Sequence, residues 1–204
     1  MTARHEAKSG VKPSKAQNRP LPGYVPILAI IIIWAAAEVL VDPRGNFPLN
    51  DDWIFGGSVW TLVTHHKFSL FYLASMSLAS QILWGALFSM LFGFSFNVLR
   101  MSTLVLGLTG ILATYGLLKE MRASAWMAFM GAMVVAFNPL YMELSNTFMT
   151  DVPFFGFAML STYLYVRALR RKSRADVIGA TLAASLWMPI PYTGPTKPPR
   201  PAGR

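Results

Sequence analysis

Apolar residues run along this chain in unbroken segments of membrane length, and the charged residues lie mainly in the polar stretches between these segments and toward the two ends of the chain. A bilayer core needs about 20 apolar residues in one helix, and unbroken runs indicate helices rather than the alternating strands of a barrel. We therefore predict an all-α, polytopic membrane protein with about four transmembrane helices. The predicted spans cover residues 24–41, 101–118, 124–141 and 152–169.

The basic residues predict the topology of these spans. Lys119 and Arg122 follow the second span, and the basic run 167–174 follows the last one. The positive-inside rule places both groups, and the basic N-terminal segment 1–23, in the cytoplasm. An even number of crossings then separates the N-terminus from Lys119.

The uncharged segment 68–99 must therefore cross the membrane twice or not at all. We expect either a re-entrant hairpin or an interfacial helix there. The preceding stretch 53–63 has apolar residues near helical spacing and predicts a further interfacial helix. Residues 42–100 and 143–151 then lie on the non-cytoplasmic side.

The two ends of the chain differ from this helical domain, which we place at residues 24–185. Residues 1–23 are polar, basic and proline-containing, and this composition predicts a disordered tail. Residues 186–204 are too rich in proline to continue a helix. One interpretation is a proline-rich ligand tail. We favour the other, a shifted or early-stopped reading frame, because the apolar run that begins at Val177 dissolves at once.

Composition supports a membrane protein. Apolar residues make up 54% of the chain and charged residues 13%, whereas soluble domains carry about 25% charged residues. The net charge of +9 comes from basic residues at helix ends and in the tails, which indicates membrane topology and contact with anionic lipid rather than nucleic acid. The absence of cysteine excludes disulfides and thiolate catalysis.

Three of the nine carboxylates lie at the predicted outer ends of helices: Asp51, Asp52 and Asp151. Ionisable groups at the membrane face indicate a functional site. Two adjacent carboxylates do not both point into one site easily. One would act as general base on an acceptor hydroxyl, and the other would position it or hold a divalent cation. A solvated loop pair is the alternative for Asp51 and Asp52, and a helix N-cap is the alternative for Asp151.

Few basic residues accompany these acids on the predicted outer side: Arg44, Lys67 and Arg100. They are candidates for binding a lipid phosphate, and the alternative is contact with lipid headgroups. Adjacent His65 and His66 would point about 100° apart on a helix, so we assign no metal site.

The order and spacing of these motifs resemble the GT-C membrane glycosyltransferases, in the branch of the protein O-mannosyltransferases and the lipid A aminoarabinose transferases. The acidic pair follows the first span. Residues 92–100 are similar to the family's entry into its second span, and Asn138-Pro139 with Thr147–Pro153 looks like its second outer loop. The segment 161–174 resembles the helix that follows. The likeness covers roughly residues 24–185.

This resemblance implies transfer of a sugar from a polyprenyl-phosphate donor to a protein, lipid or glycan acceptor at the non-cytoplasmic face, in the bacterial inner membrane. It implies that Asp51 or Asp52 is the base or binds the acceptor, and that Asp151 has the acidic role of the second loop. Family members have many more spans, so we expect this chain to be an N-terminal fragment that is inactive alone.

The alternative is a non-enzymatic small membrane protein that packs on a partner as an accessory subunit. Several glycines would permit the close helix contacts that such packing needs: Gly85, Gly93, Gly107, Gly110 and Gly116. The two hypotheses differ on the acids, which a packing subunit would not require.

Overall fold

The computed structural model describes residues 22–42, 44–68, 76–77, 79–186 and 190–191. Most of them are helical, as the sequence predicts. The helices are α1 (Tyr24–Val41), α2 (Asp52–His65), α3 (Ala79–Phe92), α4 (Phe96–Glu120), α5 (Ala125–Ala136), α6 (Pro139–Ser145), α7 (Asp151–Arg171) and α8 (Arg174–Leu186).

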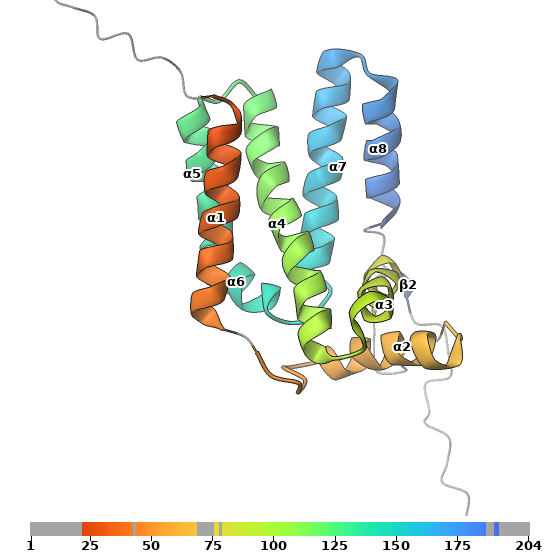
Figure 1. Cartoon of the computed structure of the whole chain (residues 1–204). Coiled ribbons are helices and arrows are strands. Elements are labelled where there is room, and N and C mark those ends of the chain that lie inside the picture. The colour runs from red at the N-terminus through yellow and green to blue at the C-terminus, as the bar shows by residue number, and fades with distance from the viewer. Residues whose placement is uncertain (1–21, 43, 69–75, 78, 187–189, 192–204) are drawn as a thin grey trace, which may run out of the picture.

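The helices form a bundle with α4 at its centre (Figure 1). Helix α4 packs most extensively along α7, which carries α8 on its other side, while α1 and α5 cover the opposite side of α4. Helix α2 lies across one end of the bundle, with α3 packed against it. Among the described helices, α1, α4 and α7 are long and apolar enough to cross a membrane. This is the architecture of a polytopic helical membrane protein.

The span predicted over residues 124–141 is broken rather than continuous. Helices α5 and α6 meet at an angle of 63°, and together they are apolar enough to form a fourth span. Proline lacks an N–H and disfavours helical geometry at the preceding residue, so Pro139 ends α5. Asn138 is extended and caps α6, because its side chain accepts a hydrogen bond from the Tyr141 N–H at 3.1 Å.

Within segment 68–99, the described residues from 79 onward form one helix, α3, and the start of α4. The 14 residues of α3 make it about 21 Å long, too short to cross a hydrocarbon core of about 30 Å. The chain then turns through Gly93, whose φ of +84° suits glycine, and Ser95 caps α4 by accepting from the Val98 N–H. Residues 69–75, where a hairpin would turn, lie outside the described residues.

The apolar run at Val177 forms part of α8, which packs against α7 and does not form a span. Ser161 on α7 donates a hydrogen bond to the Ala180 carbonyl of α8 at 3.0 Å. Beyond α8, strand β2 (Ile190–Pro191) pairs antiparallel with β1 (Met76–Ser77), so this part of the predicted tail is paired. The remainder of that tail, and the N-terminal tail up to residue 21, lie outside the described residues.

Glycine sets the close approach of α4 and α7. A Cβ atom on Gly156 of α7 would lie 2.7 Å from the Leu106 carbonyl oxygen of α4. A Cβ on Gly110 of α4 would lie 3.2 Å from the Gly156 Cα. The two backbones thus touch where both helices carry glycine, as small residues allow in membrane bundles. This contact fixes the spacing between the helices that carry Arg100 and Asp151.

Candidate active site at the α2 end of the bundle

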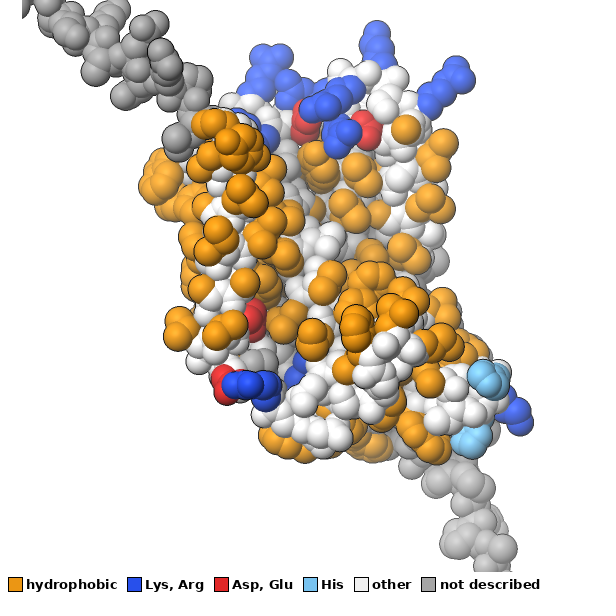
Figure 2. Space-filling view, viewed as in Figure 1, with side chains coloured by type: hydrophobic (Ala, Val, Ile, Leu, Met, Phe, Trp, Pro, Cys, Tyr) orange, Lys and Arg blue, Asp and Glu red, His pale blue; other side chains and the backbone are white. Residues whose placement is uncertain are grey.

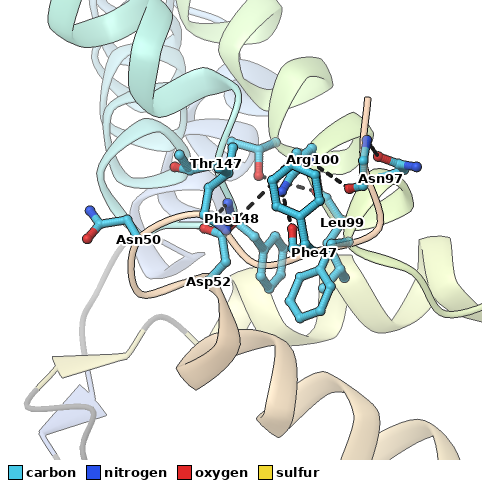
Figure 3. A network of polar contacts seen from close by, with 12 residues as sticks. Phe47, Asn50, Asp52, Asn97, Leu99, Arg100, Thr147 and Phe148 are labelled. Atoms are coloured by element: carbon cyan, nitrogen blue, oxygen red, sulfur yellow. Dashed lines mark hydrogen bonds and ion pairs between the residues drawn. The ribbon is translucent and has the colours of Figure 1, made fainter. Parts of the chain in front are cut away.

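The two acidic segments predicted from the sequence meet at the α2 end of the bundle. The Asn50 side-chain amide donates to the Met149 sulfur at 3.2 Å. The Asp52 carboxylate accepts a hydrogen bond from the Phe148 N–H at 2.7 Å. Figure 3 shows the loop before α2 wrapped against the segment that leads into α7. Residues nearly a hundred positions apart in sequence therefore form one site.

Asp52 is completely buried at the centre of this contact. Its Oδ1 accepts from Phe148, its Oδ2 accepts from the Leu49 N–H at 3.2 Å, and Oδ2 lies 3.8 Å from the Arg100 Nε. Burial raises the pKa of the Asp52 carboxyl, and the two backbone N–H groups and the Arg100 charge partly oppose that rise. The Asp52 carboxylate is thus enclosed by the loop before α2, the Phe148 backbone and Arg100.

Arg100 is the buried partner of Asp52 and is 2% exposed. It donates through Nη1 to the Gly45 carbonyl at 2.9 Å and through Nη2 to the Phe47 carbonyl, and its guanidinium lies 5.4 Å from the Phe47 ring centroid. The planar fork of arginine suits two carbonyls at once. In this structure Arg100 therefore joins α4 to the loop before α2 and points into the protein, not toward a lipid phosphate.

Two asparagines hold the same loop on α4. The Asn97 side chain accepts from the Gly45 N–H at 2.8 Å, and the Asn46 side chain accepts from the Phe96 N–H at 3.0 Å. Asn97 and Arg100 are close together in α4, and both contact Gly45 (Figure 3). The loop before α2, which carries Asp51, is therefore held against α4 through the Gly45 backbone and the Asn46 side chain.

Asp51 and Asp151 are exposed at this end, each at the start of a helix. Asp51 is the N-cap residue of α2 without a side-chain capping bond. Asp151 is the first residue of α7, where Thr150 occupies the cap position, so Asp151 is not the N-cap. Asp151 also lines a cavity of about 320 Å³ between α5, α6 and α7.

The other two predicted basic residues lie apart from the buried pair. Arg44 is exposed and forms an ion pair with Asp42, whose pKa this hydrogen bond holds below its usual range. Lys67 is exposed beyond the last turn of α2. Because α2 has 14 residues, it separates Lys67 from Asp52 by about 21 Å. His65 and His66 are exposed near Lys67.

Sequence reasoning did not assign a role to Gln81 of α3. Gln81 is completely buried, and its amide donates to the Phe148 carbonyl at 2.8 Å. Asp52 and Gln81 therefore bind the two backbone groups of one residue, Phe148, from different helices. The signal was present in the sequence, because Gln81 is the only glutamine in an uncharged run of 32 residues. Within the described residues, no group of three or more acidic or histidine side chains is placed to hold a metal ion.

A family model described as dolichyl-phosphate-mannose-protein mannosyltransferase matches residues 78–194, more than half of the chain. The chain belongs to this family. The matched stretch includes Gln81, Arg100 and Asp151, begins after Asp51 and Asp52, and ends inside the proline-rich segment. No curated protein and no solved structure matches the chain.

Membership of the dolichyl-phosphate-mannose-protein mannosyltransferase family supports a membrane glycosyltransferase of the mannosyltransferase kind. With the apolar helices, it identifies an integral membrane protein. The family also implies, in general terms, a polyprenyl-phosphate-linked sugar donor and an acceptor.

Proposed function

We propose that this chain acts in a glycosyltransferase that moves a sugar from a polyprenyl-phosphate donor to an acceptor at the non-cytoplasmic face of the membrane, and that it is inactive when purified alone. The observation that carries the proposal is the meeting of the segments around Asp51 and Asp151 at one end of the bundle. Two exposed carboxylates on converging segments are the groups that such a reaction needs in order to bind and deprotonate a hydroxyl.

The two adjacent aspartates have different roles in this proposal. Asp51 is exposed and acts as the general base, taking the proton of the acceptor hydroxyl as its oxygen attacks the anomeric carbon. The bond from that carbon to the phosphate oxygen breaks, and the lipid phosphate leaves with the electron pair. Asp52 is buried and keeps Asp51 in place through Phe148 and Arg100.

Asp151 binds hydroxyl groups of the acceptor or of the sugar at the mouth of the cavity beside α7. Arg44 is the exposed basic residue that we assign to the leaving phosphate, because Lys67 lies about 21 Å from Asp52 at the other end of α2 and Arg100 positions the loop. A divalent cation is compatible with this chemistry, but no step is assigned to one. The acceptor is a protein, a lipid or a glycan.

The charges at the other end of the bundle support the orientation. Lys119 lies in the last turn of α4, Arg122 follows that helix, and Arg170 and Arg171 end α7, so the positive-inside rule predicts that this end is cytoplasmic. The acidic site then faces outward, and the N-terminus is cytoplasmic. We place the protein in the bacterial inner membrane.

The test is sugar transfer in native membranes that contain the chain, with Asp51→Asn as the decisive variant. Loss of a general base lowers transfer by about a hundredfold or more. Glu143→Gln is the matched control, because Glu143 is an exposed acid on the same predicted face that we place outside the site. Equal transfer by the wild type and Asp51→Asn would contradict the assignment.

The same assay on the purified chain checks the expectation of inactivity. We expect no transfer by the purified 204-residue chain alone, and detectable product would overturn that expectation.

An accessory subunit is the second proposal. Only 17% of the residues of α1 are buried, so this helix offers most of its surface to lipid or to further helices. Under this proposal Asp51→Asn and Asp151→Asn leave the activity of the partner unchanged, whereas substitutions that disturb α1 lower it.

A further inference from the structure

The end of the bundle opposite the acidic site carries a dense basic surface. Figure 2 shows lysine and arginine side chains gathered over the ends of α4, α7 and α8. Two acids lie among them: Asp176 is 3.2 Å from Arg167, and Glu120 pairs with two arginines of α7. Seven basic residues accompany these two acids in the described sequence: Lys119, Arg122, Arg167, Arg170, Arg171, Lys172 and Arg174. The basic end is therefore strongly positive.

A groove of about 400 Å³ opens between α1, α4 and α7 just below this surface. Ile27 of α1, Leu112 of α4 and Leu160 of α7 contribute apolar walls. Lys119 and Arg171 line the groove at its basic end, from α4 and α7 respectively. The groove thus runs from the depth of the apolar helices to a cationic rim.

This combination fits one kind of ligand. Apolar walls at membrane depth accept an acyl chain, and basic pockets between transmembrane helices bind the headgroups of anionic lipids. Glu120 also lines the groove, but Arg170 and Arg171 hold its carboxylate at 3.6 and 3.0 Å. The three charges together leave the rim positive. Lys119 donates to the Ala123 carbonyl at 3.1 Å and carries two further N–H donors.

We propose that this groove binds one anionic phospholipid, with an acyl chain against Leu112 and the phosphate held by Lys119 and Arg171. The site is separate from the proposed sugar site, because the 25 residues of α4 extend about 37 Å between the two ends. The proposed lipid site can therefore be tested independently of the proposed transferase function. Its role is to anchor α1, which has few other contacts, against α4 and α7.

The test is native mass spectrometry of the full chain, released from micelles that contain equal amounts of phosphatidylglycerol and phosphatidylcholine. We expect the wild type to retain one phosphatidylglycerol. The double variant Lys119→Gln with Arg171→Gln removes both phosphate contacts. If each charge contributes about fivefold, the preference of this double variant for phosphatidylglycerol falls about twenty-five-fold.

A matched double variant, Arg122→Gln with Lys172→Gln, removes the same net charge from exposed residues that do not line the groove. Both charges face solvent, where salt screens them, and neither contacts the groove, so we expect the preference to change by less than about threefold. An equal loss in both double variants would show attraction to the basic surface as a whole, and would overturn a defined site.

A second pair of variants tests the groove without changing charge. Leu112→Trp fills the groove, and we expect loss of the retained lipid. Val105→Trp on the same helix is the control, because Val105 is exposed on a different groove, beside α1. Retention by Leu112→Trp equal to that of the wild type would overturn the acyl-chain placement. Displacement of phosphatidylglycerol by an equal amount of polyprenyl phosphate would overturn the phospholipid assignment.

Discussion

Both ends of the bundle contain acid–arginine pairs, but the pairs differ in burial and in what surrounds them. At the acidic end, Asp52 and Arg100 lie 3.8 Å apart with side chains 0% and 2% exposed. At the basic end, Glu120 and Arg171 lie 3.0 Å apart, and the arginine is 59% exposed. The shorter pair is the more weakly coupled one, because water and salt screen it. The distance between the charged atoms therefore does not by itself decide which pair interacts more strongly.

The partners differ as well. Asp52 and Arg100 bind backbone groups of segments far away in the chain, at Phe148 and Gly45. Glu120 forms ion pairs with two arginine side chains of α7. Hence the acidic end uses its charges to fix the path of the chain, while the basic end keeps its charges at the surface. The proposed roles follow from this contrast: a positioned site at one end and lipid contact at the other.

From this contrast we expect the substitution Asp52→Ala to have the largest effect on stability. The change leaves the Arg100 charge buried without its carboxylate and the Phe148 N–H without its acceptor. We expect the free energy of unfolding to fall by about 3–5 kcal/mol. Denaturant unfolding in micelles measures it. Asp51→Ala is the control, with an expected change within about 0.5 kcal/mol because Asp51 is exposed. An equal loss of unfolding free energy in both variants would show that Asp51 and Asp52 contribute equally to stability.

A smaller loss is expected for Arg100→Lys. Lysine keeps the charge but lacks the fork that reaches the Gly45 and Phe47 carbonyls together. We expect a loss of about 2–3 kcal/mol and faster proteolysis of the loop between α1 and α2. Arg170→Lys at the exposed pair is the control and should leave both readouts nearly unchanged. Faster cleavage in the control would show that the loop does not depend on Arg100.

The pH dependence of stability should come from the buried pair. Because burial raises the pKa of Asp52, the folded protein binds its proton more tightly than the unfolded chain does. Its contribution is then present below about pH 4, the usual value for aspartate, and is lost as the pH rises through the raised pKa. Unfolding curves of the wild type and Asp52→Asn should diverge over that range. Parallel curves would show that Asp52 does not titrate there.

The smallest effect is expected for Glu120→Gln at the basic end. Its two ion pairs are partly exposed, and such pairs contribute less than about 1 kcal/mol. High salt should abolish the difference between this variant and the wild type in unfolding experiments. A loss as large as that of Asp52→Ala would mean that the two ends are energetically equivalent.

Much of the fold was accessible from the sequence. The helix at 24–41 has the bounds of α1, and α4 and α7 extend the spans predicted at 101–118 and 152–169 by a few residues. The break at Asn138-Pro139 was visible as a motif, but we did not expect it to bend the span by 63°. Hydropathy reports only that a segment is apolar, and it does not detect an interruption of two residues.

The site was accessible only in part. The sequence identified Asp51, Asp52, Asp151 and Arg100 as unusual, since charges are scarce near apolar runs. It did not separate Asp51 from Asp52, and it grouped Arg100 with the exposed Arg44 and Lys67. Their difference in burial depends on which side of the α2 turn faces Phe148, a contact across 96 positions.

The sequence by itself determined that the protein is a helical membrane protein, approximately where α1, α4 and α7 begin and end, and which residues are its scarce acids. These properties depend on local composition, on backbone preferences and on the length of each apolar run. The tertiary structure alone decided that Asp52 faces inward while Asp51 faces outward, that Arg100 binds the loop, and that α1, α4 and α7 enclose a groove. Those outcomes depend on desolvation and on hydrogen bonds between distant segments, which exist only once the helices have packed.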